Sequence, residues 1–380
     1  MKKFLMILLI ITFSLAFGSV CTEAKEVDYL SMSWDKIVEE AKAEGLVIFY
    51  SWWGDEFWIN AAKGFEQKYG IPVKVIMADH AAKITKVLAE KDKAVGTIDA
   101  MLIGGEEINP LLAGELLYGP ILGIIPDADK LTPELSKVQE GLPTKGYLVP
   151  VYRNQTGLLY DPQRVSDPPQ TWDELVRWIK ANPKQFAFCD PSKGGSGQAF
   201  IQTVIANLCG GLDKYKGDTE LVESKVADWN LAWDWFNENK KDITITVSNF
   251  SSIDRLNQGE VSLIVAWDDD TQVNLSKGTL FKRAKMYIPK MGLPGGGDTL
   301  GVMKNAPHKA AGLLFIAYLI EKDVQIYMNE TIGSYLARTD VTVENALLPE
   351  QERQEYGTSW VPAPYKDYFI KEFVNQVLMR

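Results

Sequence analysis

The sequence contains little of the chemistry on which most hydrolases depend. It has two histidines and three cysteines among 380 residues. It has no G-x-S-x-G motif, because the nearest approach, GGSGQ, carries Gln198 in place of the last glycine. Asp268 with Asp298 could supply the two carboxylates of a glycosidase, and the acidic run Asp268–Asp270 could hold a hard cation such as calcium. Neither possibility accounts for the order of the elements along the chain, so we predict no catalytic residue, no resident metal and no cofactor.

The scarce cysteines predict no disulfide. Cys189 closes a predicted strand, and Cys209 closes the helix that follows it, which is about 12 residues or roughly 18 Å long. If the helix runs back along its strand, the two thiols lie at its opposite ends. That separation exceeds the reach of a disulfide.

Only one hydrophobic run is long, and it lies at the N-terminus. Lys2 and Lys3 precede FLMILLIITFSLAFG, which has the length of the apolar part of a signal peptide and is short for a membrane span. We predict a signal peptide over residues 1–24, cleaved after Ala24. The alternative is cleavage before Cys21, which would then carry a lipid anchor. Either route exports the protein, to the periplasm or the outer side of the cytoplasmic membrane.

Basic residues are outnumbered by acidic ones. The formal net charge of −10 becomes −12 once residues 1–20, which contain Lys2 and Lys3 and no acidic residue, are removed. An acidic surface disfavours nucleic acid and anionic lipid as partners. The roughly 355 remaining residues are too many for one core and suit two domains.

Strand and helix signals alternate along the chain, which predicts an α/β architecture. We expect a helix ending at Gly45, the strand LVIFY, and a helix over residues 56–69 with apolar side chains every four residues. From residue 148 the pattern changes. LVPVYRNQTGLLYD predicts two short strands separated by Arg153, Asn154 and Gln155, and Thr171 with Glu174 predicts a capping box.

The order of the segments resembles the extracellular solute-binding proteins of ABC importers, in their two-crossover (type II) class. The similarity is greatest to the branch that binds thiamine, polyamines and related small solutes. It rests on these segments, in chain order: the aromatic turn at 47–69, GYLVPVYRNQTGLLYD, PPQTWDEL, DPSKGGSG, GEVSLIVAW, IPKMGLPGGGDTLGV and GSYLARTDV.

The resemblance implies two α/β lobes with mixed, mostly parallel sheets, joined by two short strand linkers near 153–156 and 289–295. The ligand would occupy the cleft between them, where parallel strands place their carboxyl ends. The implied boundaries are 27–152 plus 296–345 for lobe 1, 153–295 for lobe 2, and 346–380 for C-terminal helices that pack across the lobes.

Two aromatic side chains in the first strand-to-helix turn are candidate ligand contacts. Trp52 and Trp53 follow a strand at the end that faces the expected cleft, and their indoles could stack on a planar or cationic ligand. The alternative is that one of the two indoles covers the sheet edge. Trp58 lies within the helical pattern and is expected in the core, as are Trp172, Trp229 and Trp233.

Acidic residues at two other turns predict a cationic ligand. If the strand before WDDDT continues through it, Asp268 and Asp270 share one face, and Trp267 lies on the other. The competing interpretation is a helix N-terminus, which the aspartates would stabilise through the helix dipole. Asp298, in GGGDTLG, follows glycines that let backbone approach closely, and in polyamine-binding relatives an acid at this point holds an ammonium. It could instead cap its own turn.

DPSKGGSG predicts the opposite charge preference. A strand, a glycine-rich turn and a helix start offer backbone N–H groups and Ser196 to an anion. Tyr152 and Arg153 could add a phenol and a guanidinium to the same cleft. Tyr335, in GSYLART, matches the late cleft-facing segment of the family.

The sequence therefore predicts a monomeric, non-enzymatic solute-binding protein that delivers its ligand to the permease and ATPase subunits of an ABC importer. The predicted ligand carries positive charge, as thiamine, a thiamine phosphate or a polyamine does. Phosphate, a phosphonate or a ferric ion remains the alternative.

Overall fold

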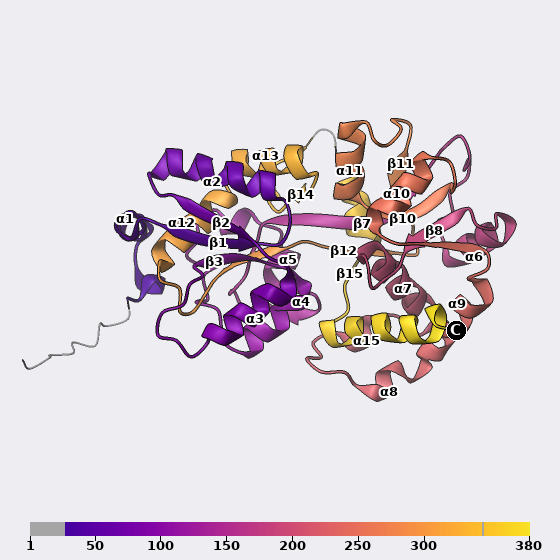
Figure 1. Cartoon of the computed structure of the whole chain (residues 1–380), viewed down its shortest axis with the longest axis horizontal. Helices are drawn as coiled ribbons and strands as arrows, with labels where there is room; N and C mark the ends of the chain where they lie inside the picture. The colour runs from indigo at the N-terminus through magenta and orange to yellow at the C-terminus, as the bar shows by residue number, and fades with distance from the viewer. Residues whose placement is uncertain (1–26, 344–345) are drawn as a thin grey trace, which may run out of the picture.

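A computed structural model describes residues 27–343 and 346–380 of the chain. The predicted signal peptide, its cleavage after Ala24 and the alternative lipid anchor at Cys21 lie outside these residues. Two α/β lobes stand side by side and are connected by crossing strands (Figure 1), as the sequence predicts. Within the described ranges, no helix combines the length and the apolar character of a membrane span.

The first lobe is built on a five-stranded sheet in the order β2-β1-β3-β13-β6. β2, β1 and β3 run parallel, whereas β13 pairs antiparallel with both of its neighbours. The strands are β1 (Val47–Ser51), β2 (Val73–Met77), β3 (Ala100–Ile103), β6 (Val149–Pro150) and β13 (Thr299–Val302), beside the hairpin β4 (Val138–Gln139) and β5 (Leu142–Pro143). The helices are α1 (Trp34–Glu44), α2 (Asp55–Tyr69), α3 (His80–Glu90), α4 (Gly105–Ala113), α5 (Pro133–Lys137), α12 (Lys309–Leu319) and α13 (Lys322–Ile332).

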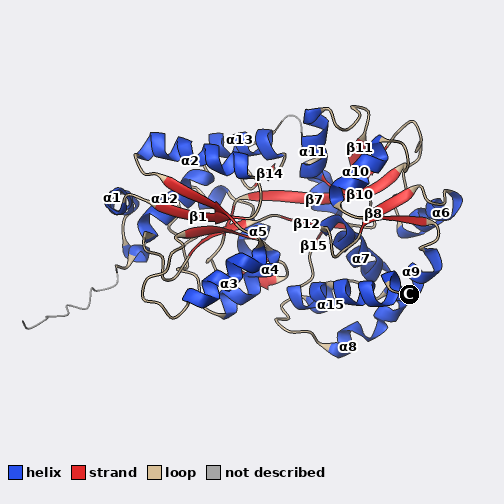
Figure 2. Ribbon diagram, viewed as in Figure 1, coloured by secondary structure: helices blue, strands red, loops and turns tan. Residues whose placement is uncertain are grey.

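The second lobe surrounds the parallel strands β10, β8 and β9, which join the crossing strands through an antiparallel pair, β10 with β7. Helices cover both faces of this sheet (Figure 2). The strands are β8 (Phe186–Cys189), β9 (Ile243–Thr246), β10 (Leu263–Trp267), β11 (Lys285–Tyr287) and β15 (Gly357–Ser359). The helices are α6 (Trp172–Ala181), α7 (Gly195–Leu208), α8 (Glu223–Val226), α9 (Asn230–Asn239), α10 (Asn249–Asn257), α11 (Asp268–Lys277), α14 (Glu350–Tyr356) and α15 (Ala363–Phe373).

Local sequence signals account for several of these boundaries. Thr171 and Glu174 form the predicted capping box at the start of α6. α2 ends where Gly70 adopts a left-handed conformation, with φ of 72°, which glycine reaches without steric cost. Trp58, Trp229 and Trp233 are buried as predicted, whereas Trp172 is half-buried against Trp235.

One prediction about the crossing is wrong. Residues 152–160 form a single nine-residue strand, β7 (Tyr152–Tyr160), and not two short strands with a break at Arg153, Asn154 and Gln155. These three residues continue the strand because their backbone finds partners on both sides. β12 (Leu293–Gly296) pairs with one edge and β14 (Tyr335–Leu336) with the other.

The chain ends in the second lobe. α15 contributes Tyr365, Phe369 and Phe373 to the core of that lobe, and it also contacts α4 of the first lobe. β15 pairs in parallel with β12, so the C-terminal segment lies beside a linker strand. Cys189 and Cys209 are buried free thiols at the two ends of α7, as predicted.

Candidate functional site

A cavity of about 420 Å³ lies between the lobes, at the carboxyl ends of parallel strands from both sheets. This is the position at which α/β sheets usually hold ligands. The first lobe contributes residues after β1, β2 and β3, and the second lobe contributes residues after β8 and β9 and from the end of β10 onward. The lining residues are Trp52, Trp53, His80, Gly104, Gly105, Glu140, Tyr152, Asn154, Lys193, Gly194, Gly195, Gln198, Asn249, Phe250, Trp267, Asp269, Asp270, Gly297, Asp298, Trp360 and Lys366.

Trp52 and Trp53 both line this cavity. The indole nitrogen of Trp52 donates to Asp298 Oδ2 at 2.8 Å, and that of Trp53 donates to the Tyr152 hydroxyl at 2.7 Å. Trp58, from the core, donates to the carbonyl of Trp53 at 2.7 Å and so fixes the turn. The two rings are tilted by 44° with centroids 5.7 Å apart. The turn therefore holds two indoles in set orientations at one wall.

Asp298 joins these aromatic groups to the linker. Its Oδ2 also accepts from the Tyr152 hydroxyl at 2.5 Å, and burial raises the pKa of its carboxyl. Gly297 precedes it with φ of 153°, and a Cβ there would lie 1.9 Å from the carbonyl oxygen of Tyr152. Only glycine allows the linker to pass this close to β7. Asp298 is thereby aimed at the cavity from the first lobe.

The acidic run begins a helix, which corrects the strand interpretation of its geometry. α11 starts at Asp268, so the alternation of a strand does not apply and Asp268 does not share a face with Asp270. Asp268 is 2 % exposed and does not line the cavity. It accepts from the backbone N–H groups of Gln155, at 2.8 Å, and Asp269, at 3.0 Å, and it forms an ion pair with Arg353.

Asp269 and Asp270 line the cavity instead. Burial, together with repulsion from the neighbouring aspartates, raises the pKa of Asp269 well above its usual range. Burial and the charge of Asp268 raise the pKa of Asp270 to about 6. Among the described residues, no lysine, arginine or histidine forms an ion pair with Asp269, Asp270 or Asp298. The basic residues that act on Asp298 from a longer distance, His80 and Lys83, form their ion pairs with Glu107 instead.

The helix start predicted to bind an anion is occupied by protein groups. Ser196 is fully buried, and its hydroxyl donates to Asn249 Oδ1 at 2.8 Å. Its backbone N–H donates to the same oxygen at 3.3 Å. Trp267 packs over the neighbouring Gly195, where a Cβ would meet the indole at 2.9 Å. The structure therefore places Trp267 in the cavity and turns the Ser196 hydroxyl away from it.

Arg153 and Tyr335 lie on the opposite side of β7 from the cavity. Consecutive strand residues point to opposite faces, so Tyr152 and Asn154 face the cavity and Arg153 faces away. The Arg153 guanidinium pairs with Glu350 at 2.9 Å and lies 4.7 Å from the Tyr335 ring centroid. The predicted shared site of Tyr152 and Arg153 is therefore split by the continuous strand.

Several lining residues carry no signal that the sequence analysis used. Asn249 and Phe250 follow β9, a strand that the sequence analysis did not predict, and a search after that strand would have found them. Glu140, Trp360 and Lys366 reach the cavity from a hairpin and from the C-terminal segment. Only tertiary packing places these three.

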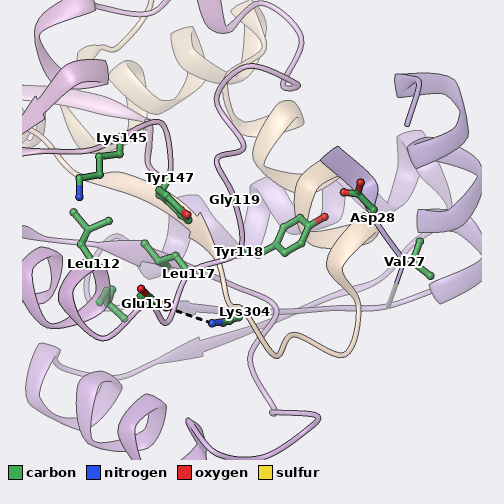
Figure 3. A pocket seen from close by; sticks show the side chains of 11 residues that line it. Val27, Asp28, Leu112, Glu115, Leu117, Tyr118, Gly119, Lys145, Tyr147 and Lys304 are labelled. Atoms are coloured by element: carbon green, nitrogen blue, oxygen red, sulfur yellow. Dashed lines mark ion pairs between the residues drawn. The ribbon is translucent and has the colours of Figure 1, made fainter. Parts of the chain in front are cut away.

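A second cavity, of about 560 Å³, lies within the first lobe (Figure 3). Leu112, Leu117, Tyr118 and Tyr147 line it, and its charged pair, Glu115 with Lys304, is 4.0 Å apart. It brings together no residue that the sequence predicts as a ligand contact. Within the described residues, no cluster of three or more histidine, cysteine, aspartate or glutamate side chains is placed to hold a metal ion.

The two-lobed fold and the cleft between its sheets define a solute-binding protein of the two-crossover type. Residues 60–349 match the family of bacterial extracellular solute-binding proteins, and the chain belongs to this family. The family is extracellular, so the protein is a solute-binding protein that acts outside the cytoplasmic membrane. A search of curated protein sequences finds no significant match.

Solved structures of periplasmic binding proteins share this fold. The spermidine/putrescine-binding protein PotD of Streptococcus pneumoniae superposes with a TM-score of 0.69 at 17% identity, covering 88% of this chain and 98% of that one. AfuA of Actinobacillus pleuropneumoniae, bound to fructose-6-phosphate, gives 0.63 at 18% identity, covering 88% and 99%. Iron-bound HitA of Pseudomonas aeruginosa gives 0.61 at 20% identity, covering 87% and 99%. The three neighbours are the substrate-binding protein of a spermidine/putrescine transporter, a protein bound to a sugar phosphate and a protein bound to iron, so the fold does not select the ligand.

Proposed function

We propose that the protein captures a small organic solute bearing positive charge, of the thiamine, thiamine phosphate or polyamine class, and delivers it to an ABC permease. The observation that carries this proposal is the charge of the inter-lobe cavity. Asp269, Asp270 and Asp298 face it, and none of them has an ion-pair partner among the described residues. A bound cation offsets the cost of keeping these carboxylates away from water.

The aromatic walls support the same ligand chemistry. Trp52 and Trp53 from the first lobe face the same cavity as Trp267 and Trp360 from the second. A cation over an indole face gains about 0.5–2 kcal/mol, more when water is excluded. The cavity volume of about 420 Å³ is in the range usual for small-molecule sites.

An anionic ligand has less support. The donors of Ser196 are already used by Asn249, and Arg153 lies behind β7. Of the two lysines that line the cavity, Lys366 pairs with Glu140, which leaves Lys193 to meet a phosphate group, and the nearby carboxylates oppose one. Phosphate, phosphonate and ferric ion are therefore the contrasting outcomes of the test.

The proposed mechanism is hinge closure. A cation that contacts Trp52 and Asp298 in one lobe and Trp267 and Asp270 in the other stabilises the closed arrangement that docks on the permease. In this mechanism the protein is a monomer and catalyses no reaction. A separate subunit of the importer hydrolyses ATP.

Thermal unfolding against a ligand panel tests the proposal. The chain without residues 1–24 is heated with thiamine, thiamine monophosphate, spermidine, putrescine, phosphate, an aminophosphonate or ferric citrate. A ligand at a thousand times its Kd adds about 4 kcal/mol of stability, which is a readily measured rise in Tm. We expect the rise with organic cations alone. A rise confined to phosphate, phosphonate or ferric citrate contradicts the proposal.

Asp270→Asn links the result to the site. The variant should lose most of the ligand-dependent rise in Tm, because a charge-assisted contact of about 1.5–3 kcal/mol is removed. Its ligand-free Tm at neutral pH should be higher than that of the wild type, because a desolvated charge is gone. Asp254→Asn, on the exposed surface of α10, is the matched control and should change neither value.

A further inference from the structure

The lobes meet across one side of the cavity through a hairpin tip. Glu140 and Gly141 form the two-residue turn between β4 and β5, with φ of 47° and 73°, as a tight hairpin of this type requires. The carbonyl of Gly141 accepts from the N–H of Gly217 in the second lobe at 3.1 Å. A Cβ on Gly141 would meet Pro362 at 2.8 Å, so the contact needs glycine. Glu140 is thus presented to the second lobe.

Lys366, from α15, meets this carboxylate inside the cavity. Its Nζ lies 3.4 Å from Glu140 Oε2, and each side chain is 11 % exposed. The same Nζ lies 4.5 Å from the centroid of the Trp360 ring. Trp360 in turn lies 6.1 Å from Trp267, with the rings tilted by 37°. All four side chains line the cavity.

An indole face and a carboxylate on either side of an ammonium make a cation-binding subsite. The cavity holds two groups of side chains of this kind. At the first, Asp270 and Asp298 form no ion pair with a lysine, arginine or histidine among the described residues. The subsite at Trp360 and Glu140 is filled by a lysine of the chain itself. The cavity therefore has room for one positive centre of a ligand. The Lys366 ammonium already occupies the position that a second positive centre would take.

We infer that Lys366 is a specificity-determining residue, which occupies the Trp360–Glu140 subsite and restricts the ligand to an organic cation with one positive centre. This inference rests on the proposed function and selects among its ligand classes. A linear diamine must either displace the Lys366 ammonium or place its second charge beside it, and both cost binding free energy. A ligand with a single positive centre meets neither cost.

Isothermal titration calorimetry with thiamine and putrescine tests this inference. The wild type should bind thiamine more tightly than putrescine. Lys366→Ala should bind putrescine at least about tenfold more tightly than the wild type does, which corresponds to about 1.4 kcal/mol, while its affinity for thiamine changes by less than about threefold. Lys366→Met, which keeps the aliphatic stem on Trp360, should shift putrescine in the same direction by less.

Two further variants separate a subsite from a simple strut between the lobes. In Lys366→Ala/Glu140→Gln the gain for putrescine should disappear, because the vacated subsite has lost its carboxylate. Lys371→Ala removes an exposed lysine from the same helix and should leave both affinities unchanged. A parallel loss of both ligands in Lys366→Ala and Lys366→Met means that the pair only closes the lobes, and it overturns the inference.

The wild-type measurement distinguishes this inference from the proposed function. If the wild type binds neither cation, the proposed function fails and the inference with it. If the wild type binds putrescine as tightly as thiamine, or the variants gain nothing for putrescine, the inference alone is overturned.

Discussion

The two faces of the crossing strand β7 hold the same kinds of residue in opposite electrostatic states. Behind the strand, Asp268 pairs with Arg353 and Glu350 pairs with Arg153. The Tyr335 ring lies between the two guanidinium groups, whose carbons are 4.3 and 4.7 Å from its centroid. On the cleft side, Asp269 and Asp270 continue the same acidic run without such partners among the described residues.

Three consecutive aspartates therefore have two different roles: Asp268 is structural, and Asp269 and Asp270 are available for binding. The carboxylate that finds an arginine fixes the start of α11 against β7 through Gln155. The two that do not are held in position by the first and remain available to a ligand. An unbalanced buried charge is costly, so its presence beside a balanced one indicates function more strongly than acidity alone does.

Disrupting the ion pair between Asp268 and Arg353, behind β7, should have the largest effect on stability. Arg353→Met leaves Asp268 buried without its partner, and the expected loss is about 3–5 kcal/mol of unfolding free energy. Urea denaturation followed by circular dichroism measures it. Arg353→Met/Asp268→Asn, which removes both charges, should recover most of the loss. A loss below about 1 kcal/mol in the single variant contradicts a structural role for the pair.

The unbalanced side should respond to pH. In the ligand-free protein the pKa of Asp270 is raised to about 6, and a bound cation lowers it. The contribution of Asp270 to cation affinity should therefore be level above pH 6 and fall as the pH falls below it, by up to about tenfold per pH unit. Titration calorimetry between pH 4.5 and 8 measures this dependence.

The stability of the ligand-free protein should show the opposite sign over the same window. The folded state binds more protons than the unfolded chain between the ordinary carboxyl pKa and about 6, so stability falls as the pH rises through that range. Asp270→Asn should flatten both curves. An affinity that rises on acidification would contradict the assignment of Asp270 as a ligand for cations.

A matched pair of aromatic substitutions should have the smallest effect. Trp52→Leu removes an indole from the cleft and should weaken cation binding by about 0.5–2 kcal/mol, or roughly 2- to 30-fold. Tyr335→Leu removes a ring from the far face of β7 and should leave affinity unchanged. Equal losses of cation affinity from the two substitutions would contradict the assignment of ligand binding to the cleft face of β7.

The sequence predicted the architecture well because the relevant signals are local. The strand LVIFY, the capping box at Thr171 and the left-handed Gly70 are each written in a few neighbouring residues. The sequence placed Trp52, Trp53 and Trp267 at the cleft for the same reason, since the first two follow a strand and the third ends one, and all three line the cavity. Residues at strand ends are therefore accessible to sequence reasoning.

The remaining predictions depended on geometry that the sequence does not state. Asp268 was assigned to the cleft because WDDDT was taken as strand, whereas the helix begins at that residue. Arg153 was predicted to face the same cleft as Tyr152, whereas the continuous strand turns consecutive side chains to opposite faces. Lys366 meets Glu140 across 226 residues of chain, a pairing that no local pattern encodes.

The unbroken strand β7 also limits how a chain of this design can change its length. Tyr152 and Asn154 serve the cleft, and Arg153 serves the ion pairs behind it, only while every residue keeps its register with β12 and β14. Insertion or deletion of one residue in β7 would exchange the two faces of the strand. The Arg153 guanidinium would then lie in the cavity, beside the aspartates that line it. Loops at the ends of the other strands have no such constraint. Descendants of this gene that acquire new solutes are therefore expected to vary in those loops while the strand keeps its nine residues.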